Sequence, residues 1–425
     1  MYPYTLHMKR PSSVLCVLML LGVSVFAYAP AVGNGYIADD FDNLKYARAF
    51  LDDPGFLFTI PPQNFRMTTF LVMGVGDRIL PSQPSILYLF SILIHALNAV
   101  LLYRLLLRLG AGWREALVAA GFFAVFQAPQ EAVMWLSAVA EAMLGTCVLA
   151  MLILWIDGRR GASTLVYCLA LFTKESAPVA MLLVVVVDWL RGQDIRSFRY
   201  AWFVPPTVGF AMIFWWVSTT NPMVQEGLYA FGPHAAGVLL RSMHRLVWPW
   251  LYLLVAAHAV VTRKWVGTAV LARALGVLAV AMSPYLFVTY TNALPSRHVY
   301  LASIGFAAII VYLVKGIPSP RFRQAFVAVF LVFNVFYLWT RKDGQFEERA
   351  APTTALLEVL EPREPGPVMI YDFAYPYPSI ARSTTQVLPS GWAESMIRLD
   401  GVDPPCPECV ALRWDPNSRE YVVGR

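Results

Sequence analysis

Residues 85–104 read SILYLFSILIHALNAVLLYR, and Arg104 at the end of this stretch is its only charged residue. A helix that crosses a membrane needs about 20 mostly apolar residues, because the hydrocarbon core is roughly 30 Å thick and each residue rises about 1.5 Å. Only helices and closed barrels satisfy every backbone polar group in lipid, and the apolar residues here are continuous rather than alternating. The stretch therefore predicts a transmembrane helix.

The composition of the whole chain agrees with this prediction. Of its 425 residues, 58% are hydrophobic and 14% are charged, whereas soluble proteins contain roughly 45–50% apolar and about 25% charged residues. A formal net charge of +6 would suggest nucleic-acid binding in a soluble domain. Here the basic residues lie between apolar runs, where they set membrane orientation. We therefore expect a lipid bilayer as a partner and no nucleic acid.

Apolar runs of this kind recur along the chain. We expect an all-α polytopic membrane protein with about eleven transmembrane helices. The third, fifth and sixth runs are short and could instead be broken or re-entrant segments, which a membrane tolerates only beside a cavity or other protein. The candidate spans are Ser13–Val32, Ser85–Arg104, Glu115–Gln127, Val133–Ile156, Ser163–Phe172, Ala177–Leu190, Trp202–Thr219, Leu246–Val261, Thr268–Tyr290, Val299–Val314 and Ala325–Thr340.

Lysine and arginine residues are concentrated in alternate loops. Short loops on the side of the N-terminus hold more of them, including Lys9 and Arg10 before the first span. Because cytoplasmic loops are enriched in these residues, we expect a cytoplasmic N-terminus in the plasma or inner membrane. We expect the first run to stay as an anchor, although Ala27-Tyr28-Ala29 also resembles the cleavage site of a signal peptide. Either way, eleven crossings place the C-terminal region outside the cytoplasm.

Two regions interrupt the apolar pattern. Residues 33–84 form a polar first outer loop within a transmembrane domain that covers residues 1–342. Residues 343–425 are rich in proline and charge, and we expect a small extracytoplasmic region, either an α+β cap or an irregular extension. Residues 368–371 and 421–423 are its candidate strands. Cys406 and Cys409 form a lone CxxC pair, for which we expect a local disulfide rather than a zinc site.

The first outer loop brings three carboxylates close to the first span. Asp39, Asp40 and Asp42 follow one another in a chain with few charges. They could supply a general base, or Asp40 and Asp42 could bind a divalent metal. Alternatively, Asp39 or Asp40 could cap the N-terminus of an interfacial helix. The residues alone leave these interpretations open.

Further polar residues lie within or beside the apolar runs. Glu131 lies at the outer end of the third span, and Glu141 lies inside the fourth, where a carboxylate usually faces a cavity or a partner. A structural role for Glu141, as a buried carboxyl that holds helices together, stays open. His95 and Asn98 share one helix face, and we expect them to form an interhelical hydrogen bond rather than a site.

Cations also lie near membrane depth. Lys174 precedes Glu175, and the two could neutralise each other, or Lys174 could present its ammonium to a phosphate. Arg297 precedes the tenth span and could extend to lipid headgroups or bind a phosphate bidentately. Taken alone, Arg297 favours the headgroup interpretation.

The order of these motifs resembles the GT-C class of integral membrane glycosyltransferases. The similarity is closest to the protein O-mannosyltransferase-like branch and covers roughly residues 10–340. It rests on Asp39-Asp40, Asn64-Phe65-Arg66, Ile94-His95-Ala96-Leu97-Asn98, Pro129-x-x-Glu131-Ala-Val-x-Trp135-x-Ser137, Lys174-Glu175 and Ser296-Arg297-His298-Val299-Tyr300-Leu301-Ala302-Ser303-Ile304-Gly305.

This resemblance implies an inverting transfer of a sugar from a polyprenyl-phosphate carrier to an acceptor hydroxyl on the outer face of the membrane. An acidic residue of the first outer loop would deprotonate the acceptor. Asp39 and Asp40 occupy that position, and we expect Asp40 to be the base. Arg297 and Lys174 match the cations that hold the lipid phosphate, and Arg66 matches more weakly.

The resemblance also bears on the acceptor side and on cofactors. Glu131, Glu141 and His298 would line the acceptor or the sugar. Because most of this branch is metal-independent, we expect no cofactor, with a metal held by Asp40 and Asp42 as the alternative. The acceptor could be protein, lipid or polysaccharide.

Several positions depart from the family pattern. Val139 stands where related enzymes often have Arg, His298 where Tyr is common and Ala302 where Pro is common, and the tetratricopeptide repeats of some relatives are absent. Two other functions therefore stay open: a flippase or transporter of lipid-linked saccharides, and an inactive envelope-assembly protein. Carboxylates in an outer loop rather than at the membrane midplane favour the enzyme.

Overall fold

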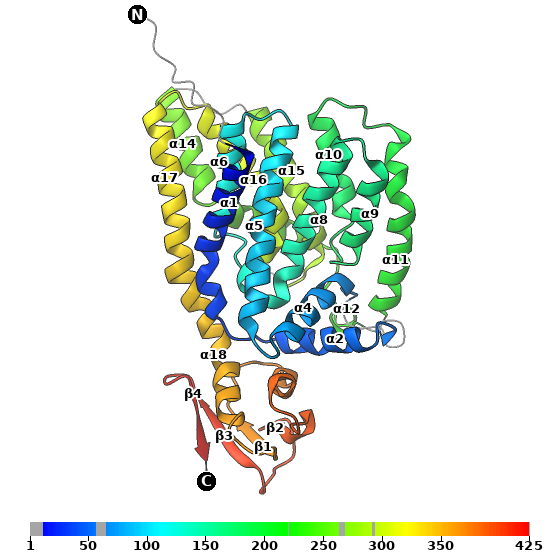
Figure 1. Ribbon diagram of the computed structural model, residues 1–425, viewed down its shortest axis with the longest axis vertical. Coiled ribbons are helices and arrows are strands. Elements are labelled where there is room, and N and C mark those ends of the chain that lie inside the picture. The colour runs from blue at the N-terminus through cyan, green and yellow to red at the C-terminus, as the bar shows by residue number, and fades with distance from the viewer. Residues whose placement is uncertain (1–11, 57–64, 220, 263–267, 291–293, 425) are drawn as a thin grey trace, which may run out of the picture.

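The computed structural model describes residues 12–56, 65–219, 221–262, 268–290 and 294–424. Lys9, Arg10 and Asn64, on which part of the sequence argument rests, lie outside these ranges. The described chain is mostly helical and forms a bundle with a small sheet at one end (Figure 1).

Each of the apolar runs contains a helix. The helices that make up the bundle are α1 (Ser13–Tyr28), α5 (Pro84–Arg108), α6 (Trp113–Val125), α8 (Val139–Ile156), α9 (Arg160–Leu171), α10 (Val179–Leu190), α11 (Val204–Ser218), α13 (His234–Val247), α14 (Trp250–Thr262), α15 (Thr268–Met282), α16 (Tyr300–Lys315) and α17 (Pro320–Tyr337).

Helix length decides which of these segments can cross a membrane. In the described ranges, six helical segments are long and apolar enough, so the chain has the build of a polytopic membrane protein. The pair α13 and α14, bent by 65°, makes a seventh if it is counted as one span. These six segments, including adjoining turns, are Ser13–Gly33, Pro84–Arg108, Leu136–Ile156, Phe198–Ser218, Ser296–Lys315 and Pro320–Leu360.

The expected count of eleven crossings is therefore not confirmed. The helix of the third run, α6, has 13 residues, which at about 1.5 Å per residue reaches only part of a bilayer core of roughly 30 Å. Helices α9 and α10 have 12 residues each. These are the three runs whose shortness the sequence already indicated.

Local sequence explains where the longest of the bundle helices starts and stops. Helix α5 begins at Pro84, which fits the first turn because its missing N–H would have no helical partner there. The chain leaves the helix at Gly110, whose φ of 86° lies in the left-handed region that glycine adopts without steric cost. Between these points the helix has 25 mostly apolar residues, which at about 1.5 Å per residue exceed the roughly 30 Å of a bilayer core.

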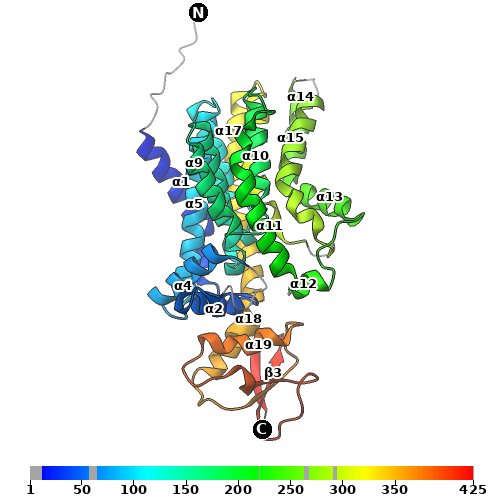
Figure 2. The ribbon, with the colours of Figure 1, turned by 90° about the vertical axis from the view of Figure 1, so that its right-hand side faces the viewer.

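In its described residues, the first loop folds into two helices across one end of the bundle (Figures 1 and 2). They are α2 (Asp40–Asp52) and α4 (Met67–Ile79). Apolar residues of both helices, including Phe50 and Phe70, pack together and against Val217 of α11. Arg48 of α2 forms a bidentate ion pair with Asp77 of α4, at 2.7 and 2.9 Å. The loop is therefore a folded platform.

The last part of the chain forms a four-stranded sheet at the same end of the bundle as α2 and α4 (Figure 1). Its strands are β1 (Val368–Tyr371), β2 (Ile397–Leu399), β3 (Val410–Asp415) and β4 (Glu420–Gly424), in the spatial order β2-β1-β3-β4. Strand β1 pairs in parallel with β2 and β3, and β4 pairs antiparallel with β3. The two predicted strands are present, and β2 and β3 were not predicted.

One continuous helical segment connects the bundle to the sheet. Helix α17 passes through a π-helical turn, η6 (Leu338–Lys342), into α18 (Asp343–Leu360), so that Pro320–Leu360 form a single segment of 41 residues. Leu356 and Leu360 at its far end belong to the core under the sheet. The expected domain boundary at residue 342 therefore falls inside this helical segment.

The sheet region also contacts the first loop. Asp42 accepts a hydrogen bond from the Ser383 hydroxyl at 2.5 Å, Lys45 forms an ion pair with Glu394 at 2.6 Å, and Arg48 donates to the Gln386 carbonyl. Ser383 ends helix α19 (Pro378–Ser383). The first loop and the sheet thus form one assembly at this end of the bundle, and we call its sheet part, residues 343–424, the cap.

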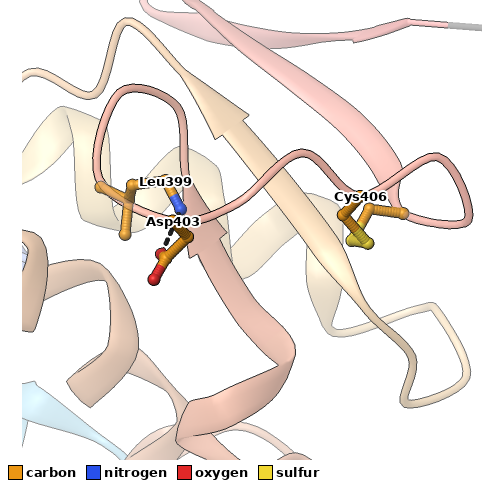
Figure 3. The surroundings of a disulfide bond; sticks show 4 residues. Leu399, Asp403 and Cys406 are labelled. Atoms are coloured by element: carbon orange, nitrogen blue, oxygen red, sulfur yellow. Dashed lines mark hydrogen bonds between the residues drawn. A yellow bond between two sulfur atoms is a disulfide. The ribbon is translucent and has the colours of Figure 1, made fainter.

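The expected disulfide between Cys406 and Cys409 is confirmed. Figure 3 shows that it lies in the loop between β2 and β3, near Asp403, which accepts a hydrogen bond from the Leu399 N–H at 2.8 Å. Arg382 donates to the same carboxylate at 2.7 Å. This loop is therefore held by a covalent bond and by an ion pair.

Candidate functional site

The predicted site residues converge where α2, the starts of two long helices and the cap meet. Helix α8 is preceded by the short helix α7 (Glu131–Met134) and the 3-10 turn η2 (Leu136–Ala138), and α16 is preceded by the 3-10 turn η5 (Ser296–Val299). These irregular turns present polar side chains at the end of the bundle. Such breaks are tolerated at membrane depth only beside protein or a cavity.

Asp40 is fully buried and its carboxylate is surrounded by hydrogen-bond donors. Oδ1 accepts from the Ser137 N–H at 2.7 Å and from the Ser137 hydroxyl at 2.5 Å, and Oδ2 accepts from the Ile37 N–H at 2.8 Å. Burial raises the pKa of Asp40 to about 7, although the hydrogen bonds from Ser137 and Ile37 oppose the shift. These contacts give Asp40 a structural role, because Oδ1 joins α2 to Ser137 in the turn before α8, whereas Oδ2 holds the turn before α2 through the Ile37 N–H.

Asp39 has a different environment. Its side chain is open to solvent, does not cap α2, and accepts no hydrogen bond from any residue in the part of the chain that the structure describes. The surrounding protein raises its pKa by desolvation, and the charges of Arg297, Arg66 and Arg349 oppose this shift. Asp39 is therefore an exposed carboxylate within electrostatic range of three guanidinium groups.

The backbone before Asp39 is strained. Ala38 has a φ of 46°, and the left-handed region costs an alanine roughly 1–2 kcal/mol because its Cβ approaches the following carbonyl oxygen. Strain of this kind persists only where surrounding contacts determine the conformation. Here Ile37 and Asp40, the residues on either side of Ala38 and Asp39, are both held. The Ile37 N–H donates to Asp40 Oδ2, and the Ile37 carbonyl accepts from Trp135 Nε1.

Two of the predicted phosphate-binding cations are each paired with a carboxylate. Arg66 forms a bidentate ion pair with Glu175, at 2.8 and 3.0 Å. Burial alone would raise the pKa of Glu175, but Arg66 and Lys174 outweigh it and lower the pKa to about 2. Lys174 Nζ lies 3.4 Å from Glu141 Oε1, and burial lowers the pKa of this lysine. Lys174 therefore pairs with Glu141 of α8 rather than only with its neighbour Glu175.

The third cation, Arg297, shares its carboxylate partner with an arginine that the sequence did not indicate. Arg297 Nη1 lies 3.6 Å from Glu131 Oε2, and Arg349 Nη1 lies 3.4 Å from Glu131 Oε1. Both guanidinium groups also lie over the Trp135 ring, at 4.7 and 4.4 Å from its centroid. Arg349 comes from α18, so the cap contributes directly to the site.

Glu141 and His298 meet at Tyr285, which the sequence also did not indicate. The Tyr285 hydroxyl donates to Glu141 Oε2 at 2.6 Å, and the Tyr285 ring stacks on the His298 imidazole at a centroid distance of 4.2 Å. His298 Nδ1 is buried and has no hydrogen-bond partner among the described residues. Two of the three residues expected to line the acceptor or the sugar thus lie in one polar cluster, in which His298 Nδ1 has no partner among the described residues.

His95 and Asn98 form the expected interhelical hydrogen bonds. His95 Nδ1 lies 2.8 Å from the Tyr300 hydroxyl, and Asn98 Nδ2 donates to the same hydroxyl at 2.9 Å and to the Ala142 carbonyl at 2.7 Å. All three side chains are fully buried. These hydrogen bonds fix α5, α8 and α16 relative to one another.

The contacts of Asp40 and Asp42 bear on the alternative in which these two carboxylates hold a metal ion. Asp40 accepts from Ser137 and Ile37, whereas Asp42 accepts from Ser383 of the cap. The two carboxylates therefore serve different partners. Within the described ranges, no group of three or more His, Cys, Asp or Glu side chains is arranged to hold a metal ion.

No family model and no curated protein matches this sequence. Among solved structures, the chain is similar to an oligosaccharyltransferase of Archaeoglobus fulgidus, whose crystal structure includes a disulfide-tethered acceptor peptide with an NVT sequon. The TM-score is 0.47 at 12% sequence identity, over 92% of this chain and 64% of that chain. This chain therefore spans less than two thirds of the length of that protein.

Proposed function

We propose that the protein is a GT-C-type inverting glycosyltransferase that moves a sugar from a polyprenyl-phosphate carrier to an acceptor hydroxyl. The proposal combines the order of the sequence motifs with the chemistry of the site. The observation that carries it is Asp39, whose exposed carboxylate accepts no hydrogen bond from the described residues and lies within electrostatic range of Arg297, Arg66 and Arg349. A base beside several cations suits a reaction that removes a proton and releases a phosphate.

The reaction follows from these charges. Asp39 takes the proton of the acceptor hydroxyl, and the acceptor oxygen attacks the anomeric carbon of the sugar from the face opposite the phosphate. The new bond to the acceptor forms while the bond between the anomeric carbon and the phosphate oxygen breaks, so the configuration inverts. The electron pair leaves with the carrier as a phosphate monoester dianion, and the nearby cations stabilise this developing charge. His298 and Glu141 would contact the sugar or the acceptor.

An apolar cavity supports a lipid-linked donor. It has a volume of about 430 Å³ and lies between α5, α8, α10, α15 and α16. Its lining includes Ala281, Leu301 and Ala302, which lie close in sequence to Tyr285 and His298 of the site. Cavities of this size hold small ligands, and an apolar lining suits an isoprenoid chain.

We further propose that the end of the bundle carrying the site and the cap faces away from the cytoplasm, as the distribution of basic residues predicts. The Cys406–Cys409 disulfide supports this orientation, because disulfides persist in oxidising compartments and are rare in the cytosol. Substrates would then be a membrane-borne donor and an acceptor of the cell envelope.

Donor binding tests the proposal. In Arg297→Ala, the purified full chain should bind radiolabelled farnesyl phosphate about tenfold more weakly, because a charge-assisted contact to a phosphate is lost. Arg321→Ala is the matched control, since Arg321 is exposed and lies in the first turn of α17, at the end of this helix away from α18 and the cap. Equal affinity in wild type and Arg297→Ala would argue against a phosphate site at Arg297.

The pH dependence of transfer tests the base. Asp39 must be ionised to accept a proton, and desolvation by the surrounding protein raises its pKa. Activity (kcat/KM) should therefore rise with pH through the pKa of Asp39, at a higher pH than for an ordinary aspartate. In Asp39→Glu this limb should move. An identical limb in both proteins would assign it to another group, such as Asp40 with its pKa of about 7.

A further inference from the structure

Arg297 and Arg349 form a pair of guanidinium groups from distant parts of the chain. Arg297 belongs to η5, and Arg349 belongs to α18 of the cap. The two residues share Glu131, with one carboxylate oxygen for each guanidinium, and share the Trp135 ring. The side chains are 21% and 32% exposed, and Glu131 is 17% exposed. All three are thus partly sheltered from water but accessible to a ligand.

The charge of this cluster is not balanced. Two carboxylates, Glu131 and Asp39, lie within range of the two guanidinium groups, and Arg245 and Lys342 add two further cations within electrostatic range of Glu131. By contrast, Arg66 and Lys174 each have a carboxylate of their own, in Glu175 and Glu141. The surplus positive charge of the site therefore lies at the arginine pair.

The geometry of the pair also suits a different anion. The distances of 3.6 and 3.4 Å to Glu131 are longer than the roughly 2.7–2.9 Å of charge-assisted hydrogen bonds. A phosphate offers an oxygen to each guanidinium, as the carboxylate does, and arginine binds phosphates in a bidentate manner. Glu131 thus binds neither guanidinium group closely, although its Oε2 also accepts from the Arg297 backbone N–H at 3.4 Å.

We propose that Arg297 and Arg349 together bind the phosphate of the donor, and that Glu131 is the internal anion with which this phosphate competes. The inference rests on the proposed function. It adds that the cap supplies part of the donor site through Arg349. When the phosphate binds, the guanidinium groups turn from Glu131 to the phosphate oxygens. Trp135 keeps both groups in place through cation–π contacts during this exchange.

Equilibrium binding of radiolabelled farnesyl phosphate to the purified full chain tests the pair. Arg349→Ala should weaken binding about tenfold, as expected for one lost charge-assisted contact. Glu131→Gln should tighten binding, because the competing charge is removed. Misfolding cannot produce a gain in affinity. Glu131→Gln therefore tests the proposal even if Arg349→Ala does not fold. Arg413→Ala is the control, because it removes an exposed cation of the cap whose side chain is 67% exposed.

The possible results separate the inference from the proposed function. If Arg297→Ala weakens binding while Arg349→Ala and Glu131→Gln do not change it, the paired site is wrong and the proposed function stands. If Arg297→Ala also has no effect, the proposed function fails. Inorganic phosphate should compete with farnesyl phosphate but bind more weakly. Equal affinity for the two would assign the site to free phosphate and overturn its role in donor binding.

Discussion

Replacing Asp39 by Asn is expected to abolish sugar transfer while leaving the fold and donor binding intact. The amide cannot accept the proton of the acceptor, and general-base catalysis typically contributes about 10²–10⁴-fold to a rate. Because the Asp39 carboxylate accepts no hydrogen bond from any described residue, its replacement by an amide removes no side-chain hydrogen bond among them. The measurement is transfer of radiolabelled sugar from a polyprenyl-phosphate donor by the purified chain.

Asp52→Asn is the matched control for this experiment. Asp52 lies at the other end of α2, is exposed, and forms a surface ion pair with Arg78 at 2.9 Å. Its loss should have little effect on transfer, because exposed ion pairs contribute little to stability. Full activity of Asp39→Asn would exclude Asp39 as the base. It would also favour the flippase or transporter interpretation, which requires no proton acceptor there.

Replacing Asp40 by Asn is expected to destabilise the protein. One of its two oxygens would become an amide nitrogen that faces an N–H or a hydroxyl, because both oxygens now accept from Ser137 and Ile37. A buried donor left without a partner costs roughly 1–3 kcal/mol, and more when the lost acceptor was charged. The midpoint of thermal unfolding in detergent should therefore fall clearly below that of wild type and of Asp39→Asn.

The partner of Asp40 provides a second test of this role. In a double-mutant cycle, Asp40→Asn and Ser137→Ala should not be additive, because both remove the same hydrogen bond. If Asp40→Asn instead keeps the wild-type unfolding midpoint but loses transfer, the roles of the two aspartates are reversed. Asp40 would then be the base, as the sequence alone led us to expect.

The two aspartates show what a sequence can predict about this site and what it cannot. The motif placed a carboxylate at the end of the first span, beside cations from other segments, and the structure brings these residues together. It could not separate Asp39 from Asp40. The difference arises because Ser137, far along the chain, donates to Asp40 and not to Asp39. Such tertiary donors leave no signal in the local sequence.

Arg349 was missed for a related reason. It lies in a charged stretch beyond the last apolar run, where an arginine would usually be solvated. Only the continuation of α17 through η6 into α18 brings it to Glu131. Strands β2 and β3 were also missed. Strand β2 has only three residues, so its hydrophobic pattern is too short to indicate a strand. The apolar runs, by contrast, predicted the helices of the bundle except α13, because a helix in lipid requires a long apolar stretch that is visible in the sequence.

The unbroken path of helix from Pro320 to Leu360 has a consequence for how related chains can vary. Every residue added to or removed from an α-helix turns all later side chains by about 100° about its axis. An insertion or deletion of one residue in η6 would therefore rotate Arg349 away from Trp135 and reorient the whole sheet. The number of residues between 338 and 349 is therefore constrained by helix geometry.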